Sequence, residues 1–238
     1  MTHDVTVFGV VLARSGSKGV KSKNLLKLGN ETLIERSVRI ALKSELLTDL
    51  IFTTDDKGYA DIALSAGANS IVFRPSELSD DFASSWDVVR HAIVEVEKNK
   101  SVKADLVVLL QPTTPFRTPF HIDEAVRAIC DEKAQAAMTI KAVDYPVEWM
   151  FWLDENKLRQ PILVPPRHIK RRQDSAGAFQ PAGTVYAVTR ERLFIDNPMV
   201  NDSLYCIEVP YNEAVNIDTI DDYKIAKAFW DETDECLL

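Results

Sequence analysis

A short segment near the N-terminus has the residue types that bind phosphate groups. Residues 12–24 are LARSGSKGVKSKN and include two glycines and four cationic side chains. Glycine lets backbone N–H groups approach an anion closely, and lysine or arginine neutralises its charge, so the segment could bind a triphosphate. No Gly-Lys-Ser/Thr sequence closes it, which excludes the Walker A motif. On these residues alone, a phosphate-binding loop and an ordinary solvated loop fit equally well.

The elements around this loop indicate an α/β fold. Residues 5–13 form an apolar, valine-rich run without polar alternation, which is typical of a strand buried on both faces of a parallel sheet. Thr32 and Glu35 form a capping box for the helix that follows the loop. Similar patterns predict helices at residues 33–43, 59–66, 84–97, 122–130 and 220–229, and strands at residues 5–13, 50–54, 70–73, 106–110, 137–143, 185–188 and 204–209. This repeated strand–helix order favours a doubly wound, Rossmann-like sandwich.

Polar residues follow three of the predicted strands. They are Ala-Arg-Ser at residues 13–15, Thr-Asp-Asp at residues 54–56 and Gln-Pro-Thr at residues 111–113. Ligands of doubly wound sheets bind beyond the carboxyl ends of the strands. The sequence therefore predicts a binding site at that edge of the sheet.

The composition excludes some classes of protein. The chain of 238 residues has 28 basic and 36 acidic side chains and a net charge of −8. A general nucleic-acid binder needs a surplus of lysine and arginine, although a few placed cations suffice for one small phosphorylated ligand. The cysteines lie far apart without a CxxC pair, so they indicate neither a disulfide framework nor a zinc site. The N-terminal apolar run is too short to span a membrane, and we expect a cytoplasmic protein.

The pattern changes between residues 144 and 172. This stretch contains four prolines and the aromatic residues Trp149, Phe151 and Trp152. It predicts an irregular excursion or a short hairpin, not another strand–helix unit. Its aromatic residues fit packing against a partner subunit and packing against the parent domain equally well. We expect a single domain over residues 1–238 with an excursion at about residues 144–180.

The N-terminal loop resembles the signature of the CMP-sialic acid synthetases, also called acylneuraminate cytidylyltransferases. That family has an Ala-Arg-x-x-Ser-Lys-Gly sequence followed by Lys-Asn, which this chain matches at Arg14, Ser17, Lys18, Gly19, Lys23 and Asn24. Further segments resemble family motifs in the same order along nearly the whole chain. They are RPSELSDDFASS at residues 74–85, LLQPTTPFR at residues 109–117, RQD at residues 172–174 with Phe179 and residues 183–186, and IDT at residues 217–219.

The resemblance implies a role for particular residues. It assigns the nucleotide to Arg14, Ser17, Lys18, Lys23, Asn24, Arg74, Ala83, Ser84 and Ser85. It assigns the acceptor sugar to Gln111, Arg172 and Tyr186, and Arg172 is suited to bidentate pairing with a carboxylate. Asp218 would bind a metal ion, and Arg14, Lys23 and Asp218 would be catalytic. Structural roles are the alternative: Ser84 and Ser85 could cap a helix, Arg172 could be solvated surface, and Asp218 could complement the N-terminus of the last helix.

Two residues depart from the family pattern. Asn216 occupies the first of two aspartate positions in the metal motif, which leaves Asp218 as the carboxylate there. An amide oxygen can still bind a hard cation, but it brings no charge. Gln180 stands where some members of the family have an arginine, so the identity of the sugar stays open.

The resemblance thus implies a nucleotidyltransferase sandwich with a small dimerisation excursion, and a homodimer. The implied reaction joins the cytidylyl group of CTP to the anomeric hydroxyl of a sialic-acid-like nonulosonic acid, with Mg²⁺ or Mn²⁺ as cofactor and pyrophosphate as leaving group. Neither nucleic acid nor a membrane is an expected partner. One alternative is a CMP-Kdo-type synthetase, whose loop usually reads Arg-x-x-Ser-x-Arg-Leu-Pro-Gly-Lys and differs from KGVK at residues 18–21. The other is a non-catalytic nucleotide-binding module.

Overall fold

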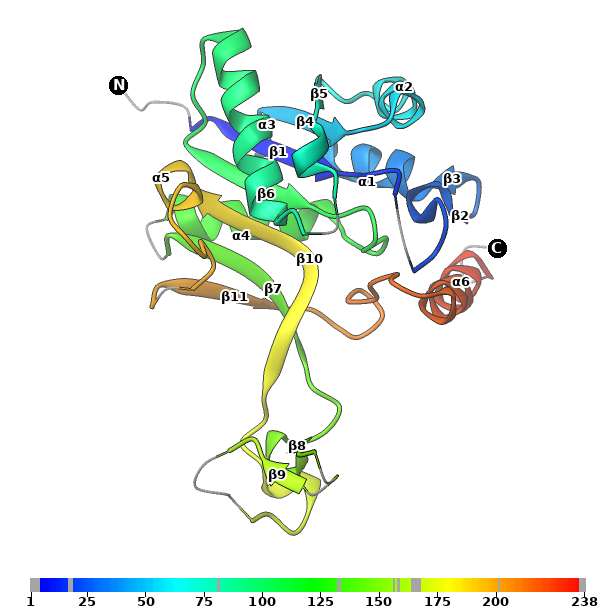
Figure 1. Cartoon of the computed structure of the whole chain (residues 1–238), viewed down its shortest axis with the longest axis vertical. Coiled ribbons are helices and arrows are strands. Elements are labelled where there is room, and N and C mark those ends of the chain that lie inside the picture. Colours follow the sequence, from blue (N-terminus) through cyan, green and yellow to red (C-terminus); the bar gives the residue numbers. More distant parts are fainter. Residues whose placement is uncertain are drawn as a thin grey trace.

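A seven-stranded sheet is the centre of the computed structural model, which describes residues 5–16, 19–80, 82–131, 134–155, 157, 159–163, 168–200 and 202–235. Its strands are β1 (Val7–Leu12), β4 (Asp49–Thr54), β5 (Ser70–Phe73), β6 (Leu106–Leu110), β7 (Ala136–Ala142), β10 (Phe179–Thr189) and β11 (Leu204–Glu208). They lie in the order β11-β7-β10-β6-β1-β4-β5 (Figure 1). Neighbouring strands are parallel, except that β10 is antiparallel to both β6 and β7.

Helices cover both faces of this sheet. The helices α1 (Leu33–Ala41), α2 (Lys57–Ser65) and α4 (Pro119–Cys130) pack on one face, and α3 (Ser85–Lys100) and α5 (Arg190–Leu193) pack on the other. Successive side chains of β1 point to opposite faces of the sheet, so the strand contributes to both cores. Val7 and Val11 pack in the first helix layer, and Phe8 and Val10 pack in the second. The doubly wound α/β sandwich predicted from the sequence is confirmed.

Strand β10 is longer than the sequence pattern predicted. The expected strand at residues 185–188 is the last part of β10, which also pairs with β7 over its first residues. Between Pro181 and Tyr186 the pairing register shifts, and Gly183 in this bulge has a φ of +78°. The bulge lies beside the carboxyl end of β6, so it belongs to the edge where the site is expected.

The segment between β7 and β10 leaves the sheet. It contains the short helices η3 (Val147–Trp149) and η4 (Arg172–Asp174) and a hairpin of β8 (Phe151–Leu153) and β9 (Arg159–Pro161). Figure 1 shows this part as a separate lobe at the far ends of β7 and β10. A short hairpin, one of the two forms predicted for this segment, is present, and its aromatic side chains are exposed.

The C-terminal helix packs on the N-terminal loop region. Helix α6 (Ile220–Glu235) shares an apolar cluster with β2 (Lys27–Leu28) and α1, and the Tyr223 hydroxyl donates a hydrogen bond to the Lys27 carbonyl at 2.7 Å. Strand β2 pairs with β3 (Glu31–Thr32), and η1 (Lys23–Leu25) precedes both. The C-terminal helix therefore lies beside the segment that follows the N-terminal loop (Figure 1). No helix in the described part of the chain is long and apolar enough to cross a membrane.

Candidate active site

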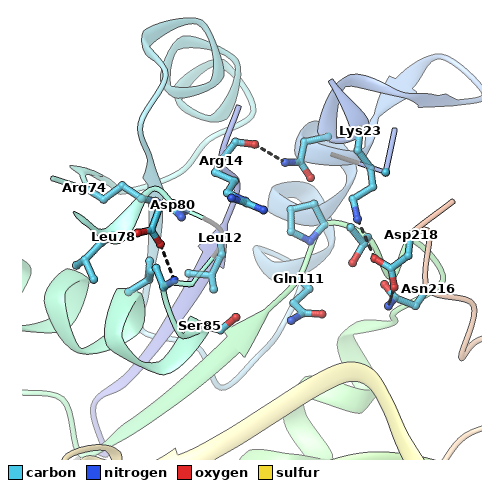
Figure 2. A pocket seen from close by; sticks show the side chains of 16 residues that line it. Leu12, Arg14, Lys23, Arg74, Leu78, Asp80, Ser85, Gln111, Asn216 and Asp218 are labelled. Carbon is cyan, nitrogen blue, oxygen red and sulfur yellow. Dashed lines mark hydrogen bonds and ion pairs between the residues drawn. The ribbon is translucent and has the colours of Figure 1, made fainter. Parts of the chain in front are cut away.

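A cavity of about 540 Å³ lies beyond the carboxyl ends of β1 and β6 (Figure 2). Four distant parts of the sequence form its walls: the N-terminal loop, the segment from the end of β5 into α3, the segment after β6 and the segment before α6. Its lining residues are Leu12, Arg14, Gly19, Lys23, Asn24, Arg74, Leu78, Asp80, Ala83, Ser85, Val88, Gln111, Pro112, Thr113, Asn216 and Asp218. The cavity thus lies at the edge of the sheet that is predicted to bind a ligand.

One end of the cavity brings Lys23 and Asp218 together. Figure 2 shows them on the side opposite Arg74 and Asp80, and the Lys23 Nζ atom lies 2.8 Å from Asp218 Oδ1. Gly19 permits this approach of loop and C-terminal segment, because a Cβ atom at Gly19 would lie 2.5 Å from the Asp218 carbonyl oxygen. Ser17 and Lys18, also assigned to the nucleotide, fall outside the described residues.

Hydrogen bonds fix the conformation of the N-terminal loop. The buried Asn24 side chain donates from Nδ2 to the Arg14 carbonyl at 3.1 Å. On the other side, the Asp55 carboxylate accepts from the Ser15 backbone N–H at 2.9 Å and from its hydroxyl at 3.1 Å. Asn24 therefore holds the loop as well as lining the cavity. In the sequence Asp55 stands out only as a polar residue at the end of a predicted strand. In the structure its carboxylate anchors the loop.

Arg74 supplies a second cation on the side of the cavity facing α3. Its Nη2 donates to the Thr53 carbonyl at 2.8 Å, which fixes the guanidinium against β4. Burial lowers the pKa of Arg74 to about 10, while the Asp55 carboxylate acts to raise this pKa and Arg14 to lower it. Arg74 remains cationic at neutral pH because this pKa is well above 7.

The N-terminus of α3 forms the neighbouring wall. Ala83 and Ser85 line the cavity, whereas Ser84 is the N-cap of α3 and its hydroxyl accepts from the Trp86 N–H at 3.2 Å. Of these two serines, Ser84 is thus the one that caps the helix. Asp80 also lines the cavity, and its Oδ1 accepts from the Phe82 and Ala83 N–H groups at 2.8 Å each. The resemblance assigned no role to Asp80. Its position as an aspartate shortly before a helix N-cap is the sequence feature that could have predicted this turn.

Gln111 lines the cavity between its two ends. It follows β6, and its backbone carbonyl accepts hydrogen bonds from the Thr114 hydroxyl at 3.0 Å and from Arg117 Nη1 at 3.1 Å. Of the three residues assigned to the sugar, Gln111 is the one in the cavity.

The structure places Arg172 and Tyr186 elsewhere. Arg172 belongs to η4 in the lobe and lines a separate pocket of about 250 Å³ there, together with Pro146 and Phe179. Tyr186 is a residue of β10 that packs edge-to-face on Trp86, with ring centroids 6.4 Å apart, and burial raises the pKa of its phenol. Neither residue lines the 540 Å³ cavity within one chain.

Asp218 and Asn216 offer oxygen atoms that fit a hard divalent cation. The Asn216 Nδ2 atom donates to Asp218 Oδ2 at 2.7 Å, and Asn216 Oδ1 is buried without a hydrogen-bond partner in the described structure. A buried oxygen without a partner beside an ionised carboxylate suits a cation that needs oxygen ligands. Among the described residues no three His, Cys, Asp or Glu side chains gather into a metal-binding group, so a cation here would rely on phosphate oxygens and water as well.

Asp222 holds the backbone of residues 218 and 219. Its Oδ2 accepts from the Asp218 N–H at 3.0 Å and from the Thr219 N–H at 2.7 Å. Burial acts to raise the pKa of Asp222, but the hydrogen bonds from Thr219 and Asp218 and the charge of Lys23 outweigh it, so the pKa is lowered. Asp222 is not among the site residues predicted from the sequence. An aspartate three residues after Thr219, at the start of a helix, was the signal that could have found it.

Comparisons with known proteins agree on one family. Residues 8–157 match the sequence model of a family described as Cytidylyltransferase. A pseudaminic acid cytidylyltransferase of Campylobacter jejuni is 29% identical over 222 residues, which are 93% of this chain and 94% of that protein. An N-acylneuraminate cytidylyltransferase of Escherichia coli O18:K1:H7 is 37% identical over 150 residues, which are 63% of this chain and 34% of that protein.

A solved structure with the same fold is similar over the full length. It is a CMP:2-keto-3-deoxy-manno-octonic acid synthetase complexed with CTP, with a TM-score of 0.67 and 19% sequence identity. The similarity covers 96% of this chain and 99% of that one. At this level of identity the likeness shows the fold alone.

Proposed function

Because this chain belongs to the cytidylyltransferase family, we propose that it transfers the cytidylyl group of CTP to the anomeric hydroxyl of a sialic-acid-like nonulosonic acid and releases pyrophosphate. One observation supports this most: the cavity joins a glycine-containing loop, cationic side chains and the Asp218 carboxylate at the carboxyl edge of the sheet. The names of the relatives from C. jejuni and E. coli support an acid of the nonulosonate class as acceptor.

The proposed chemistry is a direct displacement at phosphorus. The anomeric hydroxyl attacks the α-phosphorus of CTP, a new P–O bond forms, and the bond to the pyrophosphate oxygen breaks. Such a transfer needs positioning and charge neutralisation more than covalent catalysis. Arg14 and Lys23 would hold the triphosphate and stabilise its developing charge. The described residues that line the cavity include no cysteine or histidine, which suits direct transfer without an enzyme-bound intermediate.

The metal proposal rests on Asp218 and Asn216. A divalent cation, Mg²⁺ or Mn²⁺, would neutralise phosphate charge next to the reacting phosphorus. Asp218 would hold it through its carboxylate and Asn216 through its amide oxygen, directly or through water. Lys23 is 2.8 Å from Asp218 and would then turn to the phosphates, which carry more negative charge.

A homodimer would reconcile Arg172 with the role that the resemblance gives it. Within one chain, Arg172 lies in the exposed lobe and Gln111 in the cavity. A second copy could bring its lobe to the cavity, and the guanidinium of its Arg172 would pair with the acceptor carboxylate. Exposed apolar side chains on the lobe, among them Trp152 and Leu153, support this arrangement.

Pyrophosphate release tests the function and the acceptor together. The purified protein is incubated with CTP, Mg²⁺ and one acid from a panel: N-acetylneuraminate, its deaminated form, legionaminate, pseudaminate and Kdo. We expect release with at least one nonulosonate and little with Kdo. Release with Kdo alone would establish the CMP-Kdo alternative. No release with any acid, in a protein that binds CTP, would favour the non-catalytic module.

A further inference from the structure

The buried side chain of Arg117 donates a hydrogen bond to the backbone of Gln111, a residue that lines the cavity. Arg117 is 2% exposed and follows Phe116 in the loop between β6 and α4. No carboxylate in the described structure pairs with it, and its Nε has no hydrogen-bond partner. Burial lowers the pKa of its guanidinium to about 9, and the charge of Arg36 adds to this shift. A buried cation without a counter-ion is costly, so its retention calls for a functional reason.

The guanidinium connects three elements at one point. Its Nη1 donates to the Gln111 carbonyl at 3.1 Å and to the Thr184 carbonyl at 2.9 Å. Its Nη2 donates to the Ser37 hydroxyl on α1. One rigid guanidinium group therefore holds together the end of β6, the bulge of β10 and helix α1. A lysine could not reproduce this geometry, because its ammonium group is a single point.

The position of these contacts matters for the site. Thr184 lies in the stretch of β10 where pairing with β7 shifts register, and such bulges redirect side chains next to active sites. A Cβ atom added to the neighbouring Gly183 would lie 3.8 Å from Gln111 Oε1, so the Gln111 side chain rests beside the bulge. Arg117 thus fixes both the backbone of Gln111 and the surface against which its side chain lies.

We propose that Arg117 is a positioning residue for the acceptor acid: it holds Gln111 and the bulge of β10 in the geometry that binds the sugar. This inference rests on the proposed function. Lys23 and Arg74 donate to groups other than those that Arg117 contacts, so we expect the nucleotide side to be affected less than the acceptor side. Substitution of Arg117 should therefore impair use of the acid more than use of CTP.

The test compares steady-state constants for Arg117→Lys and Arg117→Met with those of the wild type. KM is measured for CTP at saturating acid, and for the acid at saturating CTP. We expect the KM for the acid to rise about tenfold or more, or kcat at saturating CTP to fall by a similar factor, because small displacements of positioning groups are costly. The KM for CTP should stay within about twofold. Lysine keeps the charge but loses the fork, so it should not restore the wild-type values.

Arg90→Met is the matched control. Arg90 also donates to two main-chain carbonyls, those of Leu193 at 2.7 Å and Ile195 at 2.8 Å, but on α3 away from the cavity. It should lower the melting temperature without changing either KM. If Arg117→Met does not fold, Arg117→Lys and Ser37→Ala, which removes one partner of the fork, provide the comparison.

Three outcomes would overturn the inference: an equal rise of both KM values, unchanged kinetics in Arg117→Lys and Ser37→Ala, or full restoration by lysine. A wild-type protein that turns over no acid of the panel would contradict the proposed function instead.

Discussion

Lys23 and Asp218 show how single residues control charge at one end of the cavity. The Lys23 side chain is 17% exposed and that of Asp218 is 62% exposed, so the lysine is held in place while the carboxylate stays open to solvent. A bound triphosphate would attract Lys23, and a divalent cation would replace it at Asp218. The pair therefore has the charges that a nucleotide–metal complex requires, even before either binds.

Replacing Lys23 or Arg14 by alanine tests the phosphate end. We expect each variant to stay folded and to lose a factor of ~10² or more in kcat/KM, because each removes a cation that stabilises the transferring phosphate. Lys21→Ala is the control, since Lys21 belongs to the same loop but does not line the cavity. Steady-state kinetics and circular dichroism check both points. Near-normal kcat/KM in Lys23→Ala and Arg14→Ala would refute the assignment of this loop to the phosphates.

Asp218 and Asn216 test the metal site. We expect a requirement for a divalent cation, near-complete loss of activity in Asp218→Ala, and much more residual activity in Asn216→Ala, because only Asp218 brings charge. Mg²⁺ usually takes one or two carboxylates from a protein, so one can suffice. Asn216→Asp should be active and bind the cation more tightly.

Initial rates as a function of Mg²⁺ and Mn²⁺ concentration measure these effects. The cation-induced shift in melting temperature, in the presence of CTP, gives a readout that does not depend on turnover. Normal activity of Asp218→Ala would place the metal site elsewhere in the chain.

At the scale of elements, the N-terminal loop depends on its contact with the segment before α6. A methyl group at Gly19 would lie 2.5 Å from the Asp218 carbonyl oxygen, a contact that real Cβ atoms do not make. Gly19→Ala should therefore push the loop away from Asp218 and raise the KM for CTP several-fold or more, because misplaced binding groups cost rate. Gly16→Ala is the matched control, since nothing lies within 4 Å of the added Cβ. Equal kinetics of the two variants would show that this approach has no role in binding.

Two adjacent serines at the N-terminus of α3 have different roles, one in stability and one in binding. Ser84→Ala removes the N-cap and should lower the free energy of unfolding by about 1 kcal/mol, with little change in the KM for CTP. Ser85→Ala keeps the cap but changes a residue that lines the cavity, so we expect the opposite result. Denaturant titration and steady-state kinetics of both variants measure the two effects. A raised KM for CTP in Ser84→Ala at unchanged stability would reverse the assignment.

At the scale of the whole molecule, the lobe exposes large apolar side chains that nothing in a single chain covers in the described structure. Trp152 is 68% exposed and Leu153 is 63% exposed on the hairpin of β8 and β9. We expect a homodimer that buries them, because burying such side chains is favourable and no hydrophobic cluster of the described residues includes a residue of the lobe. Arg172 would then lie near the 540 Å³ cavity only in the dimer.

Leu153→Glu should therefore give a monomer in sedimentation velocity at micromolar concentration, and it should weaken use of the acid more than binding of CTP. Phe120→Glu is the control, because Phe120 is 62% exposed on α4 and outside the lobe. A wild-type protein that sediments only as a monomer would refute the dimer.

Much of the fold was predictable from local sequence. The apolar runs of β1 and β6 and the capping box of Thr32 and Glu35 determine secondary structure within a few residues, so each element is visible without the rest of the chain. The repeated strand–helix order then predicted which edge of the sheet would hold the site. The resemblance named Arg14, Lys23, Gln111 and Asp218 in advance, and the structure brings all four into one cavity.

Tertiary structure alone decided the rest. The Lys23–Asp218 pair joins side chains 195 residues apart, and β10 inserts antiparallel between β6 and β7; no local pattern encodes either pairing. The role of Arg117 depends on which carbonyl groups the bulge of β10 leaves for it, and in sequence it is only the last residue of the segment at 109–117, to which the resemblance gave no role. Conversely, Arg172 and Tyr186 belong to the same motif-bearing stretch yet lie outside the cavity. Residue type and spacing determine what a side chain can bind, but strand pairing and burial determine which side chains meet, because these depend on contacts between parts of the chain that are distant in sequence.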